Sequence, residues 1–368
     1  MRSVLVAVLM VLAASPAHAQ YYTKSAGQNA PAAPAPVTTY DKDGRAHTEM
    51  HMVTVPADSF GNAQGNQHDL AVDGAFKGET VAVIQEYTGE GFDFSLPKKA
   101  LEEKGFSTFR WSNGVPTPED LEAALKKSSQ LWLISGSSAM LTKKHIAVIK
   151  KYFDEGHGVY IWGDNEPYYA DANLVAQALL GSDMTGNVMG DQVVGVEAKV
   201  GGVGLLPNHL LTTGLQHIYE GITIATIHPT KDMQPLIYGS AGNLVAAVYD
   251  KDGKRAILDG GFTRLFLKWD TAGTARYVKN SAAWLANVER FHSDDAKKPE
   301  LVKSVPAEEP PPGPLCPTGV SAMMAKQDAA NVPADDGVPT VWIALGLLGV
   351  IAGFAFAWVR ISRSSSTR

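Results

Sequence analysis

Residues 130–181 restrict the fold of this 368-residue chain more than any other stretch. Apolar runs at 131–134 and 159–162 are each followed by a helical pattern, at 142–155 and 170–180. Strand, helix, strand and helix at this spacing form a βαβα unit, in which the two strands run parallel. The sequence therefore predicts an α/β fold.

Two further strand and helix units precede this stretch. Strands are predicted at 80–85 and 107–111, and helices at 96–104 and 117–127. Thr117 followed by proline is typical of a helix start. Successive β-α units of this kind predict a doubly wound, mainly parallel, flavodoxin-like sheet with helices on both faces.

The regular alternation ends after this stretch. Residues 181–227 are rich in glycine and valine, which indicates an excursion of short strands and loops. Strands are predicted at 236–238, 244–249 and 255–258, and a closing helix at 277–288.

The first 19 residues have the pattern of a secretory signal peptide. Arg2 precedes an apolar core at 4–14, and Ala17-His18-Ala19 is typical of a cleavage site. An uncleaved helix is the alternative, but this core is too short to cross a bilayer of roughly 30 Å.

Residues 339–359 are predicted to form one transmembrane helix, because 341–359 contain no charged residue. The tail at 360–368 carries three arginines and no acidic residue, so the C-terminus is expected in the cytoplasm and the body outside it, periplasmic or extracellular. Gly349 and Gly353 form a GxxxG pattern that is compatible with a homodimer through this helix. Glycine is also simply common in such helices.

The remaining boundaries follow from composition. Residues 20–77 are rich in Ala, Pro, Gln, Asn and Gly, which predicts a mostly disordered lead in which 48–55 could add an edge strand. The α/β domain is expected at 78–292, and a proline-rich tether at 293–338.

The charge, the single cysteine and the spacing of the histidines argue against nucleic-acid binding, an internal disulfide and a metal site. The formal net charge is −6 and no strongly basic run occurs, so nucleic acid is not an expected partner. Cys316 is the only cysteine, which excludes an internal disulfide and leaves a free thiol or pairing between chains. His47, His51 and His68 are scattered without ligand spacing. No metal or cofactor is therefore predicted.

In open α/β sheets, ligands bind beyond the carboxyl ends of the strands. Three loops are predicted at that edge, at 135–138, 163–166 and 259–264. The ligand-binding residues predicted from these loops and the helix after the second are Ser137, Asp164, Asn165, Glu166, Tyr168, Asn173, Gly260, Gly261, Thr263 and Arg264. For each of them the alternative is a structural role in a cap or a tight turn.

Arg264 is the residue expected to recognise a ligand. Its planar guanidinium suits a carboxylate, and Asp164 or Glu166 could hold it in place. This pattern favours a small anionic ligand, and envelope proteins are the other expected class of partner.

The order of these units resembles the class I glutamine amidotransferase-like domain over about residues 80–291. The resemblance rests on that order, on 131–135, on Gly156-His157-Gly158 and on the closing strand, loop and helix. It implies a nucleophilic cysteine at 163–165 and a histidine at 259–261, but this sequence has neither residue there. The resemblance thus implies the fold without amidotransfer through a thiolate.

We therefore expect a membrane-anchored, extracytoplasmic ligand- or protein-binding module with a non-catalytic amidotransferase-like fold. The alternative is a hydrolase that uses Asp164 or Glu166 with His228 at the same edge, although no G-x-S-x-G elbow is present. These two readings differ in geometry, because a general base must lie within hydrogen-bond reach, roughly 3 Å, of its partner. A spacer in an envelope assembly is the third reading.

Overall fold

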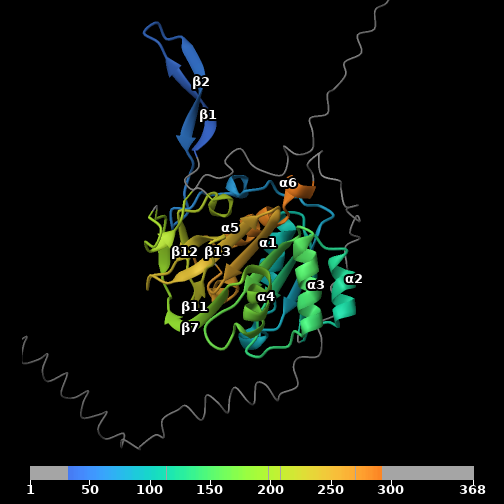
Figure 1. The fold of residues 1–368 in the computed structure, drawn as a ribbon. Coiled ribbons are helices and arrows are strands. Elements are labelled where there is room, and N and C mark those ends of the chain that lie inside the picture. Colours follow the sequence, from blue (N-terminus) through green and yellow to red (C-terminus); the bar gives the residue numbers. More distant parts are fainter. Residues whose placement is uncertain (1–31, 113, 198, 208, 270, 292–368) are drawn as a thin grey trace, which may run out of the picture. The chain divides into compact units, whose positions relative to one another are not determined.

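The computed structural model describes residues 32–291 apart from 113, 198, 208 and 270 (Figure 1). The chain divides into two units, Met1–Leu315 and Cys316–Arg368, and all described residues belong to the first. The described helices include none that is long and apolar enough to cross a membrane. Four predicted segments, together with Cys316, lie outside the described residues: the signal peptide (1–19), the tether (293–338), the transmembrane helix (339–359) and the basic tail (360–368).

One eight-stranded sheet forms the centre of the described body. Its strands are β3 (Thr80–Gln85), β4 (Ser107–Ser112), β5 (Gln130–Ile134), β6 (Gly158–Trp162), β9 (Gly204–Leu205), β12 (Met233–Tyr238), β13 (Leu244–Lys251) and β14 (Lys254–Asp259). They lie in the order β4-β3-β5-β6-β14-β13-β12-β9.

The part of the sheet from β4 to β14 is parallel, and the strands from β13 to β9 extend it antiparallel. The parallel part has the flavodoxin-like order, in which the first strand lies between the second and the third. The α/β fold class predicted from the sequence is thus confirmed.

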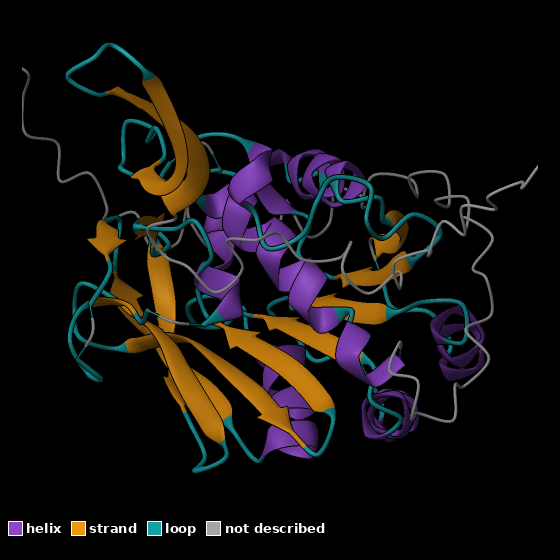
Figure 2. Cartoon of the chain, turned by 90° about the horizontal axis from the view of Figure 1, so that it is seen from above, coloured by secondary structure: helices purple, strands orange, loops and turns teal. Residues whose placement is uncertain are grey.

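Helices cover both faces of the sheet (Figure 2). They are α1 (Ser95–Glu103), α2 (Pro118–Leu125), α3 (Lys143–Asp154), α4 (Ala170–Leu180), α5 (Thr274–Leu285) and the short α6 (Val288–Phe291). One apolar core joins α1 and α5 to one face, and a second core joins α2, α3 and α4 to the other. Because both faces of β3, β5 and β6 are buried, these strands are almost continuously apolar.

Local signals begin and end the helices as the sequence predicts. The Thr117 side chain caps α2 by accepting a hydrogen bond from the Asp120 N–H (3.1 Å). Gly105 follows α1 with a φ of +97°, and a Cβ there would lie 2.8 Å from the Lys77 nitrogen. Glycine is therefore required at this turn.

The predicted excursion at 181–227 is a set of short strands. Strand β7 (Asp183–Met189) pairs antiparallel with β11 (Thr223–His228), and β8 (Val193–Gly195) pairs antiparallel with β10 (His217–Tyr219). Ile227 belongs to the core on the α3 side of the sheet, so this excursion packs on the body.

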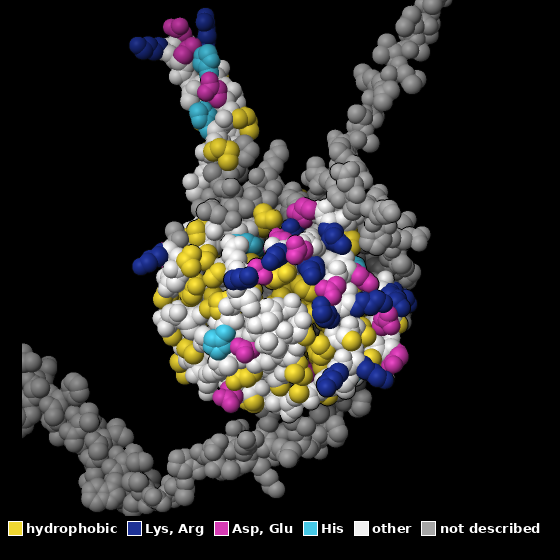
Figure 3. Space-filling view, in the orientation of Figure 1, with side chains coloured by type: hydrophobic (Ala, Val, Ile, Leu, Met, Phe, Trp, Pro, Cys, Tyr) yellow, Lys and Arg dark blue, Asp and Glu magenta, His cyan; other side chains and the backbone are white. Residues whose placement is uncertain are grey.

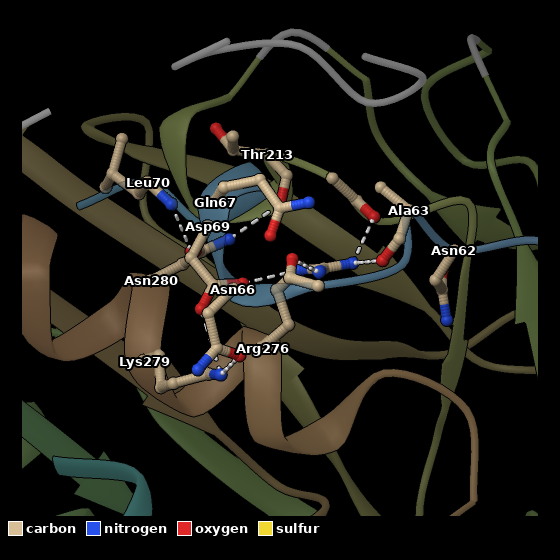
Figure 4. A network of polar contacts seen from close by, with 12 residues as sticks. Asn62, Ala63, Asn66, Gln67, Asp69, Leu70, Thr213, Arg276, Lys279 and Asn280 are labelled. Carbon is tan, nitrogen blue, oxygen red and sulfur yellow. Dashed lines mark hydrogen bonds and ion pairs between the residues drawn. The ribbon is translucent and has the colours of Figure 1, made fainter. Parts of the chain in front are cut away.

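Residues 56–77, which the sequence assigns to a mostly disordered lead, contribute to the body. Asp69 is fully buried and pairs with Lys104 (2.9 Å), Arg276 (2.7 Å) and Lys279 (2.9 Å). Figure 4 shows this segment lying along α5. The side chain of Asn280 accepts a hydrogen bond from the Leu70 N–H (2.7 Å). Leu70, Ala71 and Phe76 of the segment are also buried in the core on the α5 side of the sheet. These few apolar residues and the polar contacts hold the segment, and its mainly small and polar composition therefore gave no sign of burial.

Strand β1 (Ala32–Tyr40) and strand β2 (Ala46–Thr54) pair with each other in a two-stranded antiparallel sheet. The edge strand expected at 48–55 therefore exists as β2, but its partner is β1 and not the main sheet.

Candidate functional site

The three loops expected at the carboxyl edge of the sheet do meet there. The Gly163 N–H donates to the Asp259 carbonyl (2.8 Å), and the Phe262 N–H donates to the Gly163 carbonyl (3.3 Å). The Ser135 N–H in turn donates to the Trp162 carbonyl (3.0 Å). The ends of β5, β6 and β14 are thus joined side by side.

Arg264 does not face a ligand. Its side chain is fully buried and forms an ion pair with Asp259, which is buried as well. The guanidinium also donates to the Gly261 carbonyl (3.0 Å), and Asp259 accepts from the hydroxyls of Tyr160 (3.2 Å) and Tyr277 (3.0 Å). The predicted role of Arg264 in ligand recognition is therefore wrong, because its donors are engaged inside the protein.

The other predicted residues of this loop also have structural roles. A Cβ at Gly260 would lie 2.7 Å from the Ala225 carbonyl oxygen, and a Cβ at Gly261 would lie 2.4 Å from the Glu220 carbonyl oxygen. The Thr263 hydroxyl accepts a hydrogen bond from the Ile222 N–H (2.8 Å). These residues fix the loop against the excursion.

Asp164 lies at the edge with only 6% of its surface exposed. Burial raises the pKa of its carboxyl well above the usual value, and the Asn165 backbone N–H and the charge of Arg264 oppose the shift only in part. The oxygen Oδ1 of Asp164 is buried without a hydrogen-bond partner. A protonated carboxyl group, which can donate a hydrogen bond, is the form that suits this environment.

The turn after Asp164 brings three further predicted residues to the surface. Asn165 is partly exposed, Glu166 is exposed and Tyr168 is partly exposed. The Tyr168 N–H donates to the Asn165 carbonyl (2.8 Å), which closes the turn. Asp164 does not cap α4, because the residue that precedes this helix is Tyr169.

Asn173 and Ser137 do not converge on one point. Asn173 binds the backbone of Met184 through both its side-chain oxygen and its side-chain nitrogen (2.8 Å each). It therefore joins α4 to β7. Ser137 is exposed in the loop after β5.

Glu86 and Asp171, which the sequence prediction missed, form a carboxyl pair at this edge. Glu86 directly follows β3, and its Oε2 accepts a hydrogen bond from the Gly136 N–H (2.8 Å). Burial, then a hydrogen bond with Asp171 and the charge of Asp171, raise the pKa of Glu86 to about 9. Although the residue is partly exposed, its oxygen Oε1 is buried without a hydrogen-bond partner, so the neutral form of the Glu86 carboxyl suits this position.

Asp171 is held rigidly in this pair. It is fully buried and accepts hydrogen bonds from the backbone N–H groups of Met140 (2.6 Å) and Leu141 (3.1 Å). The hydroxyl of Ser135 accepts from the N–H groups of Asp171 and Ala172 (3.1 Å each), and so caps the first turn of α4.

The carboxyl pair occupies the topological switch point of the sheet. Strand β3 has β4 on one side and β5 on the other, and Glu86 and Gly136 follow β3 and β5. Ligands of doubly wound proteins bind in the crevice at such a point. The same strand-end rule, applied to β3 as well as to later strands, would have indicated Glu86 from the sequence.

Aromatic rings from three loops lie together at this edge. The ring of Tyr87 contacts those of Tyr168 (5.4 Å between centroids) and Phe262 (5.1 Å) edge to face. Phe92 contacts Phe262 (5.1 Å) and Phe266 (4.9 Å). The edge therefore combines carboxyl groups with raised pKa values and aromatic rings, which suits hydrogen bonding and stacking.

His228 is not placed to act with Asp164 or Glu166. Its Nδ1 bonds Asp183 Oδ1 (2.7 Å), which is its partner across β7 and β11, and both side chains are about half exposed. Within residues 32–291, leaving aside the four that are not described, no group of three or more His, Cys, Asp or Glu could hold a metal ion.

No family model matches the chain, and no curated protein matches it. Solved structures with a similar arrangement include a GMP synthase-like protein from Thermoplasma acidophilum, which is 12% identical, covers 58% of this chain and 96% of its own, and has a TM-score of 0.35. A ThuA-like protein from Parabacteroides merdae is 12% identical over 56% of this chain and 89% of its own (TM-score 0.38).

A third similar structure is the CTPS glutaminase domain from Trypanosoma brucei, which is 9% identical over 56% of this chain and 93% of its own (TM-score 0.26). Similarities at this level assign neither an activity nor a ligand to the chain, so the site depends on its own geometry.

Proposed function

We propose that this protein is a membrane-anchored, extracytoplasmic binding module with an amidotransferase-like body that does not catalyse amidotransfer. The observation that supports the proposal most strongly is which side chains lie at the carboxyl edge of the sheet. Gly163-Asp164-Asn165 and Asp259-Gly260-Gly261 occupy the places where the resemblance would put a cysteine and a histidine. Asp259 is engaged by Arg264 and two tyrosines, so it is not available as a base.

The proposed ligand is a neutral polar molecule with hydroxyl or amide groups. Burial raises the pKa of both Glu86 and Asp164, which favours the neutral form of each carboxyl group at this edge. A neutral ligand suits such groups better than a charged one. Tyr87 and Tyr168 supply aromatic surface beside them. An anionic ligand is less well supported than the sequence suggests, because the guanidinium of Arg264 is engaged inside the protein.

Export and anchoring are supported by the two ends of the sequence. The signal peptide pattern at 1–19 and the uncharged stretch at 341–359 favour a single-pass protein with an exported body and a cytoplasmic C-terminus. The pattern of Gly349 and Gly353 favours a homodimer through that helix as part of the same proposal.

A hydrolase remains the second candidate, but the geometry supports it less well. His228 is bonded to Asp183, and Asp164 is buried in an environment that favours its neutral form. Glu166 is exposed. The proposed hydrolase needs a histidine within hydrogen-bond reach of Asp164 or Glu166 at this edge, and the contacts described for His228 do not provide it.

Binding to arrayed neutral oligosaccharides and amides tests the proposal. We expect saturable binding by the wild-type chain, a loss of binding in Glu86→Ala and Tyr168→Ala, and wild-type binding in Glu102→Ala, which changes an exposed carboxylate on α1. Each variant should retain the circular dichroism of the folded body.

The same experiment separates the two candidates. The bound molecule should be recovered unchanged by mass spectrometry. A hydrolysed product that disappears in His228→Ala would contradict the binding proposal and favour the hydrolase. Equal binding by all variants would show that the carboxyl edge is not the site.

A further inference from the structure

The hairpin of β1 and β2 has a regular register and a hydrogen-bonded turn. Within the part of the chain that the structure describes, no other strand pairs with its edges and no other element covers its faces. Each strand has nine residues, and the two form a sheet of their own. The turn is fixed by Asp41, whose Oδ1 accepts from the N–H groups of Asp43 (2.9 Å) and Arg45 (2.8 Å). Isolated two-stranded sheets are at best marginally stable in water, and three or more strands are needed for independent stability.

The side chains of the hairpin are unusually apolar for an exposed element. Tyr40 is 73% exposed, and Met50 and Met52 are 65% exposed each. The cross-strand register places Tyr40 opposite Ala46, Pro36 opposite Met50 and Thr38 opposite Thr48, so these residues share one face. The other face carries His47, Glu49 and His51, and Figure 3 shows histidine and acidic side chains alternating along the hairpin.

One edge of the hairpin is closed to further strands. Pro34 and Pro36 have no N–H, so the ladder between the strands runs through the odd-numbered residues of β1. The even-numbered positions turn their backbone groups away from β2, and two of them lack a donor. The outer edge of β1 therefore cannot accept another strand along its length.

The other edge is open. Because odd-numbered residues of β2 face β1, the even-numbered residues from Ala46 to Thr54 direct their N–H and C=O groups outward. None of these residues is proline. The hairpin thus has one edge that is blocked and one edge with all its hydrogen-bonding groups. Because only one edge can pair, two hairpins can form a closed dimer, but they cannot continue into an open fibre.

We propose that β2 pairs antiparallel with β2 of a second copy of this chain, which forms a four-stranded sheet about a two-fold axis. In the register of complete overlap, Met50 lies opposite Met50 of the second copy, and Thr48 lies opposite Met52 of the second copy. In this register each residue with outward-pointing backbone groups lies opposite another such residue, as the hydrogen bonds of an antiparallel ladder require.

Charge selects the same register. Complete overlap places Glu49 opposite His51 of the second copy, and this pair occurs twice in the dimer. The two side chains already approach each other within one chain (3.4 Å), so both point to the same face. Shifting the register by two residues would place Glu49 opposite Glu49, or His51 opposite His51, which loses this complementarity. The partner is therefore best matched by an identical strand.

Disulfide trapping in the full-length chain tests this pairing. All variants carry Cys316→Ser, which removes the native thiol. Met50→Cys should form a disulfide-linked dimer under mild oxidation, because directly opposed residues of this type have Cα atoms about 5.5 Å apart, within the range of disulfides. Thr38→Cys, an exposed position on β1, is the matched control and should not link.

The register has its own test. Chains with Thr48→Cys should link to chains with Met52→Cys when the two are mixed, and neither should link to itself. Trapping at position 50 no faster than at position 38, or self-linking at position 48, would overturn the proposal.

A proline substitution in β2 distinguishes strand pairing from accidental cross-linking between chains. Met50→Pro removes one outward N–H and leaves the ladder between β1 and β2 intact, whereas Met50→Thr keeps that N–H. We expect the linkage between positions 48 and 52 to be lost in Met50→Pro and retained in Met50→Thr, with the same unfolding midpoint for the body. Unchanged linkage in Met50→Pro would refute pairing through β2, even if the chains associate through another segment.

Discussion

Replacing Glu86 by glutamine should change the pH dependence of stability in a defined direction. Glutamine is the neutral isostere of a protonated glutamate, so it can still accept from the Gly136 N–H and donate to Asp171. The variant therefore keeps the contacts of the protonated form and removes only the ability to ionise.

The size of the effect follows from proton linkage. The pKa of Glu86 is raised to about 9 in the folded protein from 4.5, mainly by burial and then by Asp171. The folded state then holds a proton that the unfolded state has lost, so stability falls as pH rises between these two values. The slope is about 1.4 kcal/mol per pH unit, which gives a loss of up to about 4 kcal/mol between about pH 5 and about pH 8.

Urea unfolding followed by tryptophan fluorescence at several pH values measures this loss. Burial lowers the pKa values of His157 and His209 to about 4, and these groups change stability in the opposite direction as pH rises. They are present in both proteins, so the difference between Glu86→Gln and wild type isolates Glu86. We expect Glu86→Gln to gain stability relative to wild type as pH rises. A difference that stays constant between pH 5 and pH 8 would refute a protonated Glu86.

Three stability predictions concern other parts of the body. Arg264→Met should lower the free energy of unfolding by about 3–5 kcal/mol, because it leaves the Asp259 carboxylate buried without its cation; a loss below about 1 kcal/mol in urea titration would contradict the ion pair. Thr117→Ala should cost about 1 kcal/mol through loss of the α2 cap, and an unchanged urea midpoint would contradict that role. Asn62→Ala should cost about 2 kcal/mol, because its Oδ1 accepts from the N–H groups of Gln216 and His217; hydrogen exchange at these two amides should speed up, and unchanged exchange would count against the contact.

The strands and helices of the body could be predicted because their signals are local. The prediction for the helix that forms α4 matches its observed bounds, Ala170–Leu180, and the strand at 80–85 matches β3. Apolar runs bounded by glycine and polar turns indicate these elements without any knowledge of long-range contacts.

The candidate site could be predicted only in part, because burial of polar residues depends on distant partners. Gly-Gly-Phe-Thr-Arg has the composition of an exposed loop, and only the placement of Tyr160 and Tyr277 around Asp259 reveals its burial. The three predicted loops do lie together at one edge of the sheet, but Arg264 is buried in an ion pair and is not available to a ligand. Glu86 and Asp171 come from separate segments, so their pairing depended on knowing which strands are neighbours.

The most direct test of the binding proposal is a crystal structure of the body purified without steps that displace a bound molecule. The account predicts electron density for a neutral polar ligand at the switch point, within hydrogen-bond distance of the Glu86 carboxyl and in contact with Tyr87 or Tyr168. A ligand bound elsewhere, for example in the groove of about 400 Å³ lined by Phe109, Trp111 and α2, with an empty carboxyl edge, would contradict it.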